Sequence, residues 1–363
     1  MITIVMGGQF GSEGKGSVVS VLAGRYQWDL IIRTGSPNAG HTFRKPDGFL
    51  VKMRQLPATW CYAKHTPVYI PAGAVVSKEV LLAEVRTLRA GGFDAPIYVS
   101  PLAAVIDYEA ILQEKVITTG TTGEGVGATR ARKCLRQATL VRDDPDFYPG
   151  TELGNTISLD HDWVHNIVSN KNSSILIEAT QGFGLSLDGN NYPFVTSINL
   201  TVYRILDDAE IPFGVHYIRP VLVVRVFPIR IAGNSGPLAN ETSWSDLRQR
   251  YGNHIPDEQT TVTRKTRRVG GWDAELVERA IAVNKPTEIV LTFVDYIFPN
   301  IKGTGVTDEI NHWLMGLEDS IDRLFNYLGI GIGELMDRVG GQIITPTGVS
   351  GMASNAIVMG TVD

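Results

Sequence analysis

Cysteine is scarce in this chain, and it has no long uncharged apolar run. The 363 residues include two cysteines, Cys61 and Cys134, too few for a disulfide framework or a cysteine-based zinc site. No segment reaches the roughly 18 apolar residues that a membrane-spanning helix needs. Positive charge is not in excess either, because the formal net charge is −5. The sequence therefore favours neither a nucleic-acid surface nor a membrane surface.

The remaining composition is that of an ordinary globular protein. The chain is 43% hydrophobic and 20% charged, and it is long enough to bury a large core. Met1 leads straight into an apolar segment, which leaves no room for a signal peptide, and the few thiols suit a reducing compartment. We therefore expect a cytosolic protein. Without an internal repeat or a low-complexity linker, residues 1–363 are expected to form a single domain.

Glycine is concentrated directly after the first predicted strand. Residues 1–6 form a short β-branched run, and residues 7–16 (GGQFGSEGKG) hold five glycines and a lysine before a predicted helix. A strand, a glycine-rich turn and a helix in this order aim backbone N–H groups at a phosphate. The Walker A spacing does not fit, because five residues separate Gly8 from Gly14 and Gly16 follows Lys15. The alternative is a glycine-rich turn with a purely structural role.

Further apolar runs alternate with amphipathic segments. They predict strands at residues 29–33, 174–179, 221–231 and 288–295, and helices at 78–89, 107–117 and 307–328. This alternation favours an α/β fold with a central, mostly parallel sheet flanked by helices, a P-loop-like phosphate loop at the N-terminus and long loops inserted at strand ends. In such folds ligands bind beyond the carboxyl ends of the strands.

Two later loops suggest further ligand groups. Residues 118–127 (TTGTTGEGVG) combine hydroxyls with glycines, which suits a second anion. Residues 260–270 (TTVTRKTRRVG) are the densest positive cluster, and guanidinium groups beside hydroxyls suit a dicarboxylate. A nucleic-acid patch is the alternative for this cluster. The acidic chain and the lack of interleaved aromatic residues disfavour it.

Together these motifs resemble the adenylosuccinate synthetase family, whose members ligate aspartate to a purine nucleotide. Gly-x-Glu-Gly-Lys-Gly at residues 11–16 and Asn-Ala-Gly-His at residues 38–41 carry the resemblance, which runs from end to end and is thinnest after residue 295. One position departs, because this chain has Ser12 where the family has an Asp that serves as catalytic base and magnesium ligand. Loss of that Asp marks a viral branch, the 2-aminoadenylosuccinate synthetases, which use dGMP in place of IMP.

The resemblance implies roles for the N-terminal loops. It makes His41 the general acid, and it makes Gln181 with Lys15 the groups that stabilise the purine 6-oxygen. It places Mg²⁺ at the carbonyl of Gly40 and at Ser12, which stands in the position of the base. It also implies that the donor phosphates bind to Gly11, Glu13, Gly14, Lys15, Gly16, Gly40, His41 and Thr42.

The other ligand sites follow from the same resemblance. The substrate nucleotide is expected at Ser12, Asn38, Thr121, Thr122, Gln181 and Thr196, together with an arginine that crosses a homodimer interface, Arg136 by spacing or Arg132 as the alternative. Aspartate is expected at Thr261, Val262, Thr263 and Arg267, although Arg264 and Lys265 replace a family Gly-Arg pair. The donor base is expected at Asp295, Thr347 and Gly348. Phe293 stands where GTP-using members carry a lysine, so ATP or dATP is expected as donor.

Three functions are compatible with these residues. The first is ligation of aspartate to dGMP, giving 2-amino-N6-succinyl-dAMP in the cytoplasm of a virus-infected host cell. The second is an ordinary adenylosuccinate synthetase that uses IMP and GTP. The third is a nucleotide-binding protein without activity, which the retention of His41, Gln181 and Lys15 disfavours. Because a serine hydroxyl is a poor base, water, a phosphate oxygen or Glu13 is expected to take the purine N1 proton.

Overall fold

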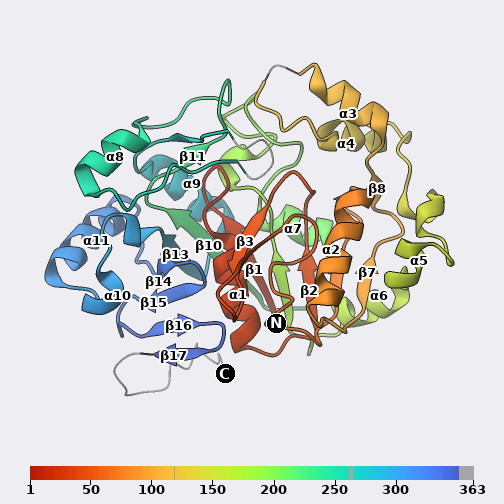
Figure 1. The fold of residues 1–363 in the computed structure, drawn as a ribbon, viewed down its shortest axis with the longest axis horizontal. Helices are drawn as coiled ribbons and strands as arrows, with labels where there is room; N and C mark the ends of the chain where they lie inside the picture. Colours follow the sequence, from red (N-terminus) through yellow and green to blue (C-terminus); the bar gives the residue numbers. More distant parts are fainter. Residues whose placement is uncertain (118, 261–264, 351–363) are drawn as a thin grey trace.

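The computed structural model describes residues 1–117, 119–260 and 265–350, and its core is one large sheet (Figure 1). The strands of this sheet are β1 (Ile2–Gly7), β2 (Leu30–Arg33), β5 (Val68–Ile70), β7 (Ile97–Val99), β9 (Ile175–Glu178), β10 (Ile218–Arg225), β13 (Glu288–Thr292), β14 (Tyr327–Gly331), β15 (Glu334–Asp337), β16 (Ile343–Thr345) and β17 (Gly348–Ser350). Their order is β17-β16-β15-β14-β13-β10-β1-β9-β2-β5-β7. Neighbours from β14 to β7 pair in parallel, whereas β14 to β17 form an antiparallel meander. The predicted α/β fold with a mostly parallel sheet is confirmed.

Helices cover both faces of this sheet. In the described ranges the α-helices of the chain are α1 (Lys15–Arg25), α2 (Lys78–Ala90), α3 (Tyr108–Lys115), α4 (Val126–Cys134), α5 (Glu152–Thr156), α6 (His161–Ser169), α7 (Val202–Asp208), α8 (Trp244–Tyr251), α9 (Ala274–Asn284), α10 (Ile301–Thr304) and α11 (Asp308–Ser320). Helices α1 and α2 contribute to the core on one face, and α6, α7, α9 and α11 contribute to the core on the other. Within the described ranges, none of the helices combines the length and the apolar character that crossing a membrane requires.

Short strand pairs lie outside the main sheet. They are β3 (His41–Arg44) with β4 (Leu50–Met53), β6 (Val75–Val76) with β8 (Ala104–Val105), and β11 (Ile229–Arg230) with β12 (Arg268–Val269). The first pair extends the loop that follows β2, and the last joins the chain after β10 to the basic segment near residue 268. Both pairs therefore hold loops that emerge near the carboxyl ends of central strands.

Strand β1 lies near the middle of the sheet because it is apolar on both faces. Ile2, Ile4 and Met6 belong to one core and Val5 to the other, and none is more than 1% exposed. A strand buried on both faces is typical of a parallel sheet with helices on each side. The glycine-rich loop after β1 therefore emerges at the centre of the edge where the loops after β2, β9, β10 and β13 also begin.

Two predicted elements are shorter than expected. The run at 221–231 is broken after Arg225, because Pro228 has no N–H for a strand ladder and only its carbonyl is used, by Gly270. The helix predicted at 307–328 ends at Ser320, since Asp322 adopts a left-handed backbone conformation with φ 48°. Its last residues instead begin β14.

Candidate active site

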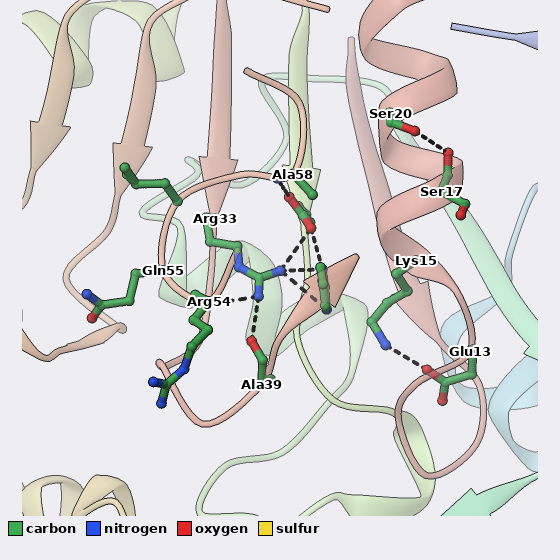
Figure 2. A network of polar contacts seen from close by, with 12 residues as sticks. Glu13, Lys15, Ser17, Ser20, Arg33, Ala39, Arg54, Gln55 and Ala58 are labelled. Carbon is green, nitrogen blue, oxygen red and sulfur yellow. Dashed lines mark hydrogen bonds and ion pairs between the residues drawn. The ribbon is translucent and has the colours of Figure 1, made fainter. Parts of the chain in front are cut away.

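The glycine-rich loop after β1 folds around the carboxylate of Glu13. Glu13 Oε1 accepts hydrogen bonds from the N–H groups of Gln9 (3.1 Å) and Gly11 (2.8 Å), and Oε2 lies 2.6 Å from Lys15 Nζ (Figure 2). Gly7 leaves room for this arrangement, since a Cβ atom there would lie 2.5 Å from Glu13 Oε2. The carboxylate is fully buried and engaged on both oxygens. This geometry argues against Glu13 as the base.

The first turn of α1 packs against the loop that carries Asn38 and His41. A Cβ atom at Gly16 would lie 2.7 Å from the carbonyl oxygen of Thr42. A serine or threonine after Lys15, as in a Walker A loop, would therefore collide with backbone. The glycine at this position allows the two N-terminal loops to meet.

His41 is buried together with Glu178 and Arg33. His41 Nδ1 contacts Glu178 Oε1, which also lies 3.0 Å from Arg33 Nη1, and the N–H of Ala58 donates to Glu178 Oε2 at 2.8 Å. Figure 2 shows Arg33 between Ala39 and Ala58, with its guanidinium group directed toward this cluster. Burial and then the charge of Arg33 lower the pKa of His41 to about 3. The imidazole is therefore neutral at pH 7.

The charge on Glu178 offsets that of its cationic neighbour. Burial alone would raise the pKa of Glu178, but Arg33 and His41 hold it below its usual value. The carboxylate of Glu178, at the end of β9, is thus ionised. It fixes the orientation of the His41 ring.

A cavity of about 500 Å³ lies where these loops converge. Expected site residues from six separate segments line it: Gly11, Ser12, Lys15, Asn38, Gly40, His41, Thr121, Thr122, Gln181, Thr196 and Arg267. Its other walls include Phe10, Phe194, Arg230, Thr260 and Lys265. The structure thus brings together eleven of the residues that the sequence motifs single out.

Ser12 and Gln181 face this cavity from strained backbone positions. Both adopt the left-handed conformation, with φ 57° and 60°, which is uncommon for residues other than glycine. Lys15 Nζ donates to the carbonyl oxygen of Gln181, and Gln181 Nε2 donates to Asn38 Oδ1 at 3.4 Å. The phosphate loop, the loop after β2 and the end of β9 are therefore linked at this point.

The second hydroxyl-rich loop is occupied by an anion from its own chain. The carboxylate of Glu114 on α3 accepts hydrogen bonds from the N–H groups of Gly125 (2.8 Å) and Ala128 (3.1 Å) at the start of α4. The N–H groups of Gly125 and Ala128 are therefore engaged within the chain, so the prediction of a second anion at this loop rests on its hydroxyl side chains. The side chains of Thr121 and Thr122 still line the cavity.

The two arginines considered for an interface differ in their surroundings. Arg132 forms two hydrogen bonds to the carboxylate of Asp107 (2.7 and 2.8 Å) and one to Glu109 (3.2 Å). Arg136 lies beyond the end of α4, where it is exposed and does not line the cavity of its own chain. This geometry favours Arg136 over Arg132 as a residue that could reach a partner.

The segment expected to bind aspartate is described in part. Thr261, Val262 and Thr263 lie outside the described residues, as does Arg264. Arg267 lines the cavity, and burial lowers its pKa while the nearby Glu258 opposes this shift. The one described residue of the four therefore faces the proposed site.

The residues expected at the donor base lie on two separate turns. Asp295 follows β13 close to Phe293, whose ring would contact a Cβ atom at Gly14. Thr347 and Gly348 lie at the turn between β16 and β17, where Pro346 packs against Gly24 in the last turn of α1, ~15 Å along the helix from Gly14. The turn with Thr347 and Gly348 therefore lies near the opposite end of α1 from Gly14.

A different turn lies beside the end of β13. Strand β14 pairs in parallel with β13, and a Cβ atom at Gly329 would lie 2.9 Å from Thr292. The glycine-rich stretch at residues 329–333 could have signalled this turn, but the predicted helix at 307–328 obscured it. Burial raises the pKa of Asp295 at the neighbouring strand end to about 6.

Several other charged residues of the site were not foreseen. Arg33 and Glu178 each end an apolar strand, and a charged residue in that position is the signal that could have revealed them. Arg54 joins two loops, since its Nε donates to the carbonyl of Pro37 at 2.6 Å and its Nη2 pairs with Glu124. Nothing in the local sequence distinguishes Arg54 from a surface arginine.

The oxygen atoms at the cavity suit a metal ion that arrives with phosphates. Within the described ranges, no three His, Cys, Asp or Glu side chains cluster as metal ligands. Mg²⁺ commonly binds through one or two protein oxygens together with substrate phosphates and water. The carbonyl of Gly40 and the hydroxyl of Ser12 belong to residues that line the cavity beside the phosphate loop, so the donor set fits such an ion.

Comparison with known proteins agrees with this geometry. The family model for adenylosuccinate synthetase matches residues 4–147 and 150–304. The N6-succino-2-amino-2'-deoxyadenylate synthase of Vibrio phage phiVC8 is 32% identical over 308 residues, which covers 82% of this chain and 87% of that protein. The adenylosuccinate synthetase of Archaeoglobus fulgidus is 33% identical over 311 residues, which covers 81% and 83%.

Solved structures give the same result. The succinoaminodeoxyadenylate synthetase (PurZ) of cyanophage S-2L, bound to dGMP and to dATP as an energy donor, aligns with a TM-score of 0.77 and 26% identity over 93% of this chain and 95% of that one. The adenylosuccinate synthetase of Plasmodium falciparum aligns with a TM-score of 0.76 over 91% and 97%, and at 18% identity it supports the fold alone. The chain therefore belongs to the adenylosuccinate synthetase family and is a carbon–nitrogen ligase.

Proposed function

We propose that this protein ligates L-aspartate to C6 of dGMP, with ATP or dATP as phosphoryl donor, to give 2-amino-N6-succinyl-dAMP. The observation that carries the proposal is Ser12, which lines the cavity beside Gln181 within an otherwise complete phosphate loop. Phage proteins whose names describe this product are among the relatives of the chain. We further propose that the protein acts in the cytoplasm of the host cell.

The first step makes a leaving group of the purine 6-oxygen. The oxygen attacks the γ-phosphorus of the donor, the donor diphosphate leaves, and N1 loses its proton. In this proposal the start of α1 and Lys15 bind the donor phosphates, and the amide of Gln181 stabilises the 6-oxygen. Mg²⁺, held by Gly40 and Ser12, would supply neutralisation of the phosphate charge when bound.

His41 acts as the general acid in this proposal. Its Nδ1 is directed at the ionised Glu178, so only a protonated Nε2 can donate to an oxygen of the transferring phosphoryl group. Burial and Arg33 keep the ring neutral at pH 7 before the donor binds, so the negative phosphates have to raise the pKa of His41. Because Glu13 is engaged inside the phosphate loop, water or a phosphate oxygen is left to take the N1 proton.

In the second step the aspartate amine displaces the new phosphate. Arg267 lines the cavity and binds a carboxylate of aspartate in this proposal, with Thr263 and its neighbours completing the site. The substrate phosphate is held by Asn38, Thr122 and Thr196. In a homodimer, Arg136 of one subunit reaches the nucleotide of the other.

Ser12 explains the choice of dGMP through space. A carboxylate at this position would press against the 2-amino group of guanine, whereas the shorter hydroxyl leaves room for it or accepts its hydrogen bond. Ser12 therefore determines substrate choice at the same position where the family carries its catalytic base.

The deciding experiment is phosphate release by the purified protein with aspartate, Mg²⁺ and ATP or dATP, comparing dGMP with IMP. We expect release with dGMP and at least about tenfold less kcat/KM with IMP. Release with IMP alone would refute the proposal in favour of an ordinary synthetase. No release with either nucleotide, with GTP also tried, would support a binding protein without activity.

An ordinary adenylosuccinate synthetase is the second candidate. The specific observation in its favour is that cellular synthetases match this chain as closely as the phage enzyme does, at 33% against 32% identity. The IMP arm of the same assay distinguishes the two.

A further inference from the structure

Two walls of the cavity come from distant parts of the chain. One wall is the phosphate loop with Ser12. The other is formed by two antiparallel segments that we call the stalk, residues 258–260 and 265–267. Arg267 N–H donates to the carbonyl of Glu258 at 2.8 Å, and Thr260 N–H donates to that of Lys265 at 2.9 Å. Thr260, Lys265 and Arg267 line the cavity.

Arg225 contacts both walls. It ends β10 and is fully buried. Its Nη1 donates to the carbonyl oxygen of Ser12 at 3.0 Å and to Glu258 Oε2 at 3.2 Å, while its Nη2 pairs with Glu258 Oε1. The centroid of the Phe293 ring lies 4.0 Å from the Cζ atom of Arg225. A planar guanidinium with two separate acceptors fixes the distance between them.

Glu258 is the matching residue on the stalk. Its carboxylate accepts hydrogen bonds from Nη1 and Nη2 of Arg225. Its Oε1 also accepts one from the hydroxyl of Tyr296 at 3.2 Å. Its backbone carbonyl receives the N–H of Arg267. One residue therefore joins the buried arginine to the cation that faces the cavity.

We propose that Arg225 and Glu258 are positioning residues that hold the phosphate loop and the stalk at a fixed separation, so that the aspartate amine meets C6 of the nucleotide. This inference rests on the proposed function. Phosphoryl transfer to the 6-oxygen uses the phosphate loop, Gln181 and His41, and it does not use the stalk. Amine attack involves both walls, because the nucleotide and the aspartate are bound on opposite sides.

The second step is therefore the sensitive one. In it the aspartate nitrogen bonds to C6, the bond between C6 and the phosphorylated oxygen breaks, phosphate leaves with the electron pair, and the amine loses a proton to solvent. A displacement of about 1 Å between reacting groups costs on the order of 100-fold in rate.

The principal variant is Glu258→Gln, which keeps the contact between Arg225 and Ser12 but removes the charge that anchors the stalk. Single-turnover reactions with dGMP, aspartate and donor would measure donor cleavage and product formation in the same samples. We expect donor cleavage within about threefold of the wild-type rate and product formation slower by about 100-fold. Tyr296→Phe removes one hydrogen bond to Glu258. It should also slow product formation more than donor cleavage, but by a smaller factor than Glu258→Gln does.

The matched control is Glu288→Gln. Glu288 pairs with Arg219 at the other end of β10, at 2.6 Å, so the same chemical change is made far from the cavity. We expect both rates to stay within about twofold of wild type even where the melting temperature falls. If Glu258→Gln slowed both steps equally, or slowed neither step, the inference would be overturned. Absence of any reaction in the wild-type protein would instead refute the proposed function.

Discussion

Ser12 combines three features that a serine on a surface loop would not share. It has a left-handed backbone, its carbonyl oxygen is held by Arg225, and it lines the cavity beside Gln181. The backbone is therefore fixed by contacts that do not involve the side chain. A substitution at this position should change the chemistry of the cavity with little change in the path of the loop.

Ser12→Asp tests the space argument directly. Aspartate tolerates left-handed φ values better than most residues, so the loop should keep its conformation. We expect kcat/KM for dGMP to fall by about tenfold or more relative to that for IMP, because the carboxylate meets the 2-amino group. Steady-state phosphate release with each nucleotide would measure the ratio.

Ser12→Ala is the matched control for Ser12→Asp. It removes the hydroxyl without adding bulk, so the ratio of dGMP to IMP should stay closer to that of the wild type. If Ser12→Asp increased turnover of dGMP relative to IMP, the carboxylate would be acting as the missing base and the space argument would fail.

Two glutamates show what a sequence cannot reveal about a side chain. Glu13 and Glu114 both lie in or beside segments that suit phosphate, yet each carboxylate turns inward and accepts backbone N–H groups. The sequence shows a charge near a glycine-rich loop but not the direction in which it points. Such direction depends on which backbone donors the fold leaves unpaired.

At the scale of elements, the strands of the sheet were predictable where apolar runs ended in a polar loop. The runs at 29–33 and 174–179 appear as β2 and β9, which are buried throughout. The run at 221–231 is split, since Pro228 interrupts a pattern that hydrophobicity alone continues. The apolar pattern of residues 221–231 continues through Pro228, although proline has no backbone N–H to donate to a neighbouring strand.

Gly16→Ala tests the contact between α1 and the loop of His41. The new Cβ atom would lie 2.7 Å from the carbonyl of Thr42, so either the helix start or the loop has to move. We expect loss of about 1–3 kcal/mol in the free energy of unfolding and a fall of about 100-fold in kcat. Urea denaturation and steady-state kinetics would measure the two effects.

Gly316→Ala makes the same change on α11, where a Cβ atom meets nothing within 4 Å. Because alanine favours helix, this variant should gain about 0.5–1 kcal/mol in stability with unchanged kinetics. Wild-type activity in Gly16→Ala would show that the two loops need not touch during the reaction.

At the scale of the whole molecule, the cavity depends on strand order. The hydroxyl of Thr292 donates to the carbonyl of Glu13, although 279 residues separate them along the chain. Strand order places β1 between β9 and β10, so that loops from three distant segments meet. Resemblance singled out many of the residues that line the cavity, whereas links such as the one from Arg225 to Glu258 required the assembled sheet.

Arg136 extends the argument beyond one chain. Its side chain is exposed past the end of α4, whereas Arg132 is paired within its own chain. If a homodimer places Arg136 at the nucleotide of its partner, each active site takes residues from two subunits. Activity would then depend on how variants are combined.

Mixing two inactive variants tests this arrangement. Arg136→Ala lacks the crossing arginine, and Lys15→Ala lacks the lysine of the phosphate loop. In a mixed dimer, one site combines an intact Lys15 from one chain with an intact Arg136 from the other. Random exchange should therefore restore about a quarter of wild-type activity, measured as phosphate release after co-refolding or subunit exchange. Two Lys15→Ala preparations mixed together should restore nothing. If the mixed sample stayed inactive while native mass spectrometry showed that mixed dimers had formed, Arg136 would not cross the interface.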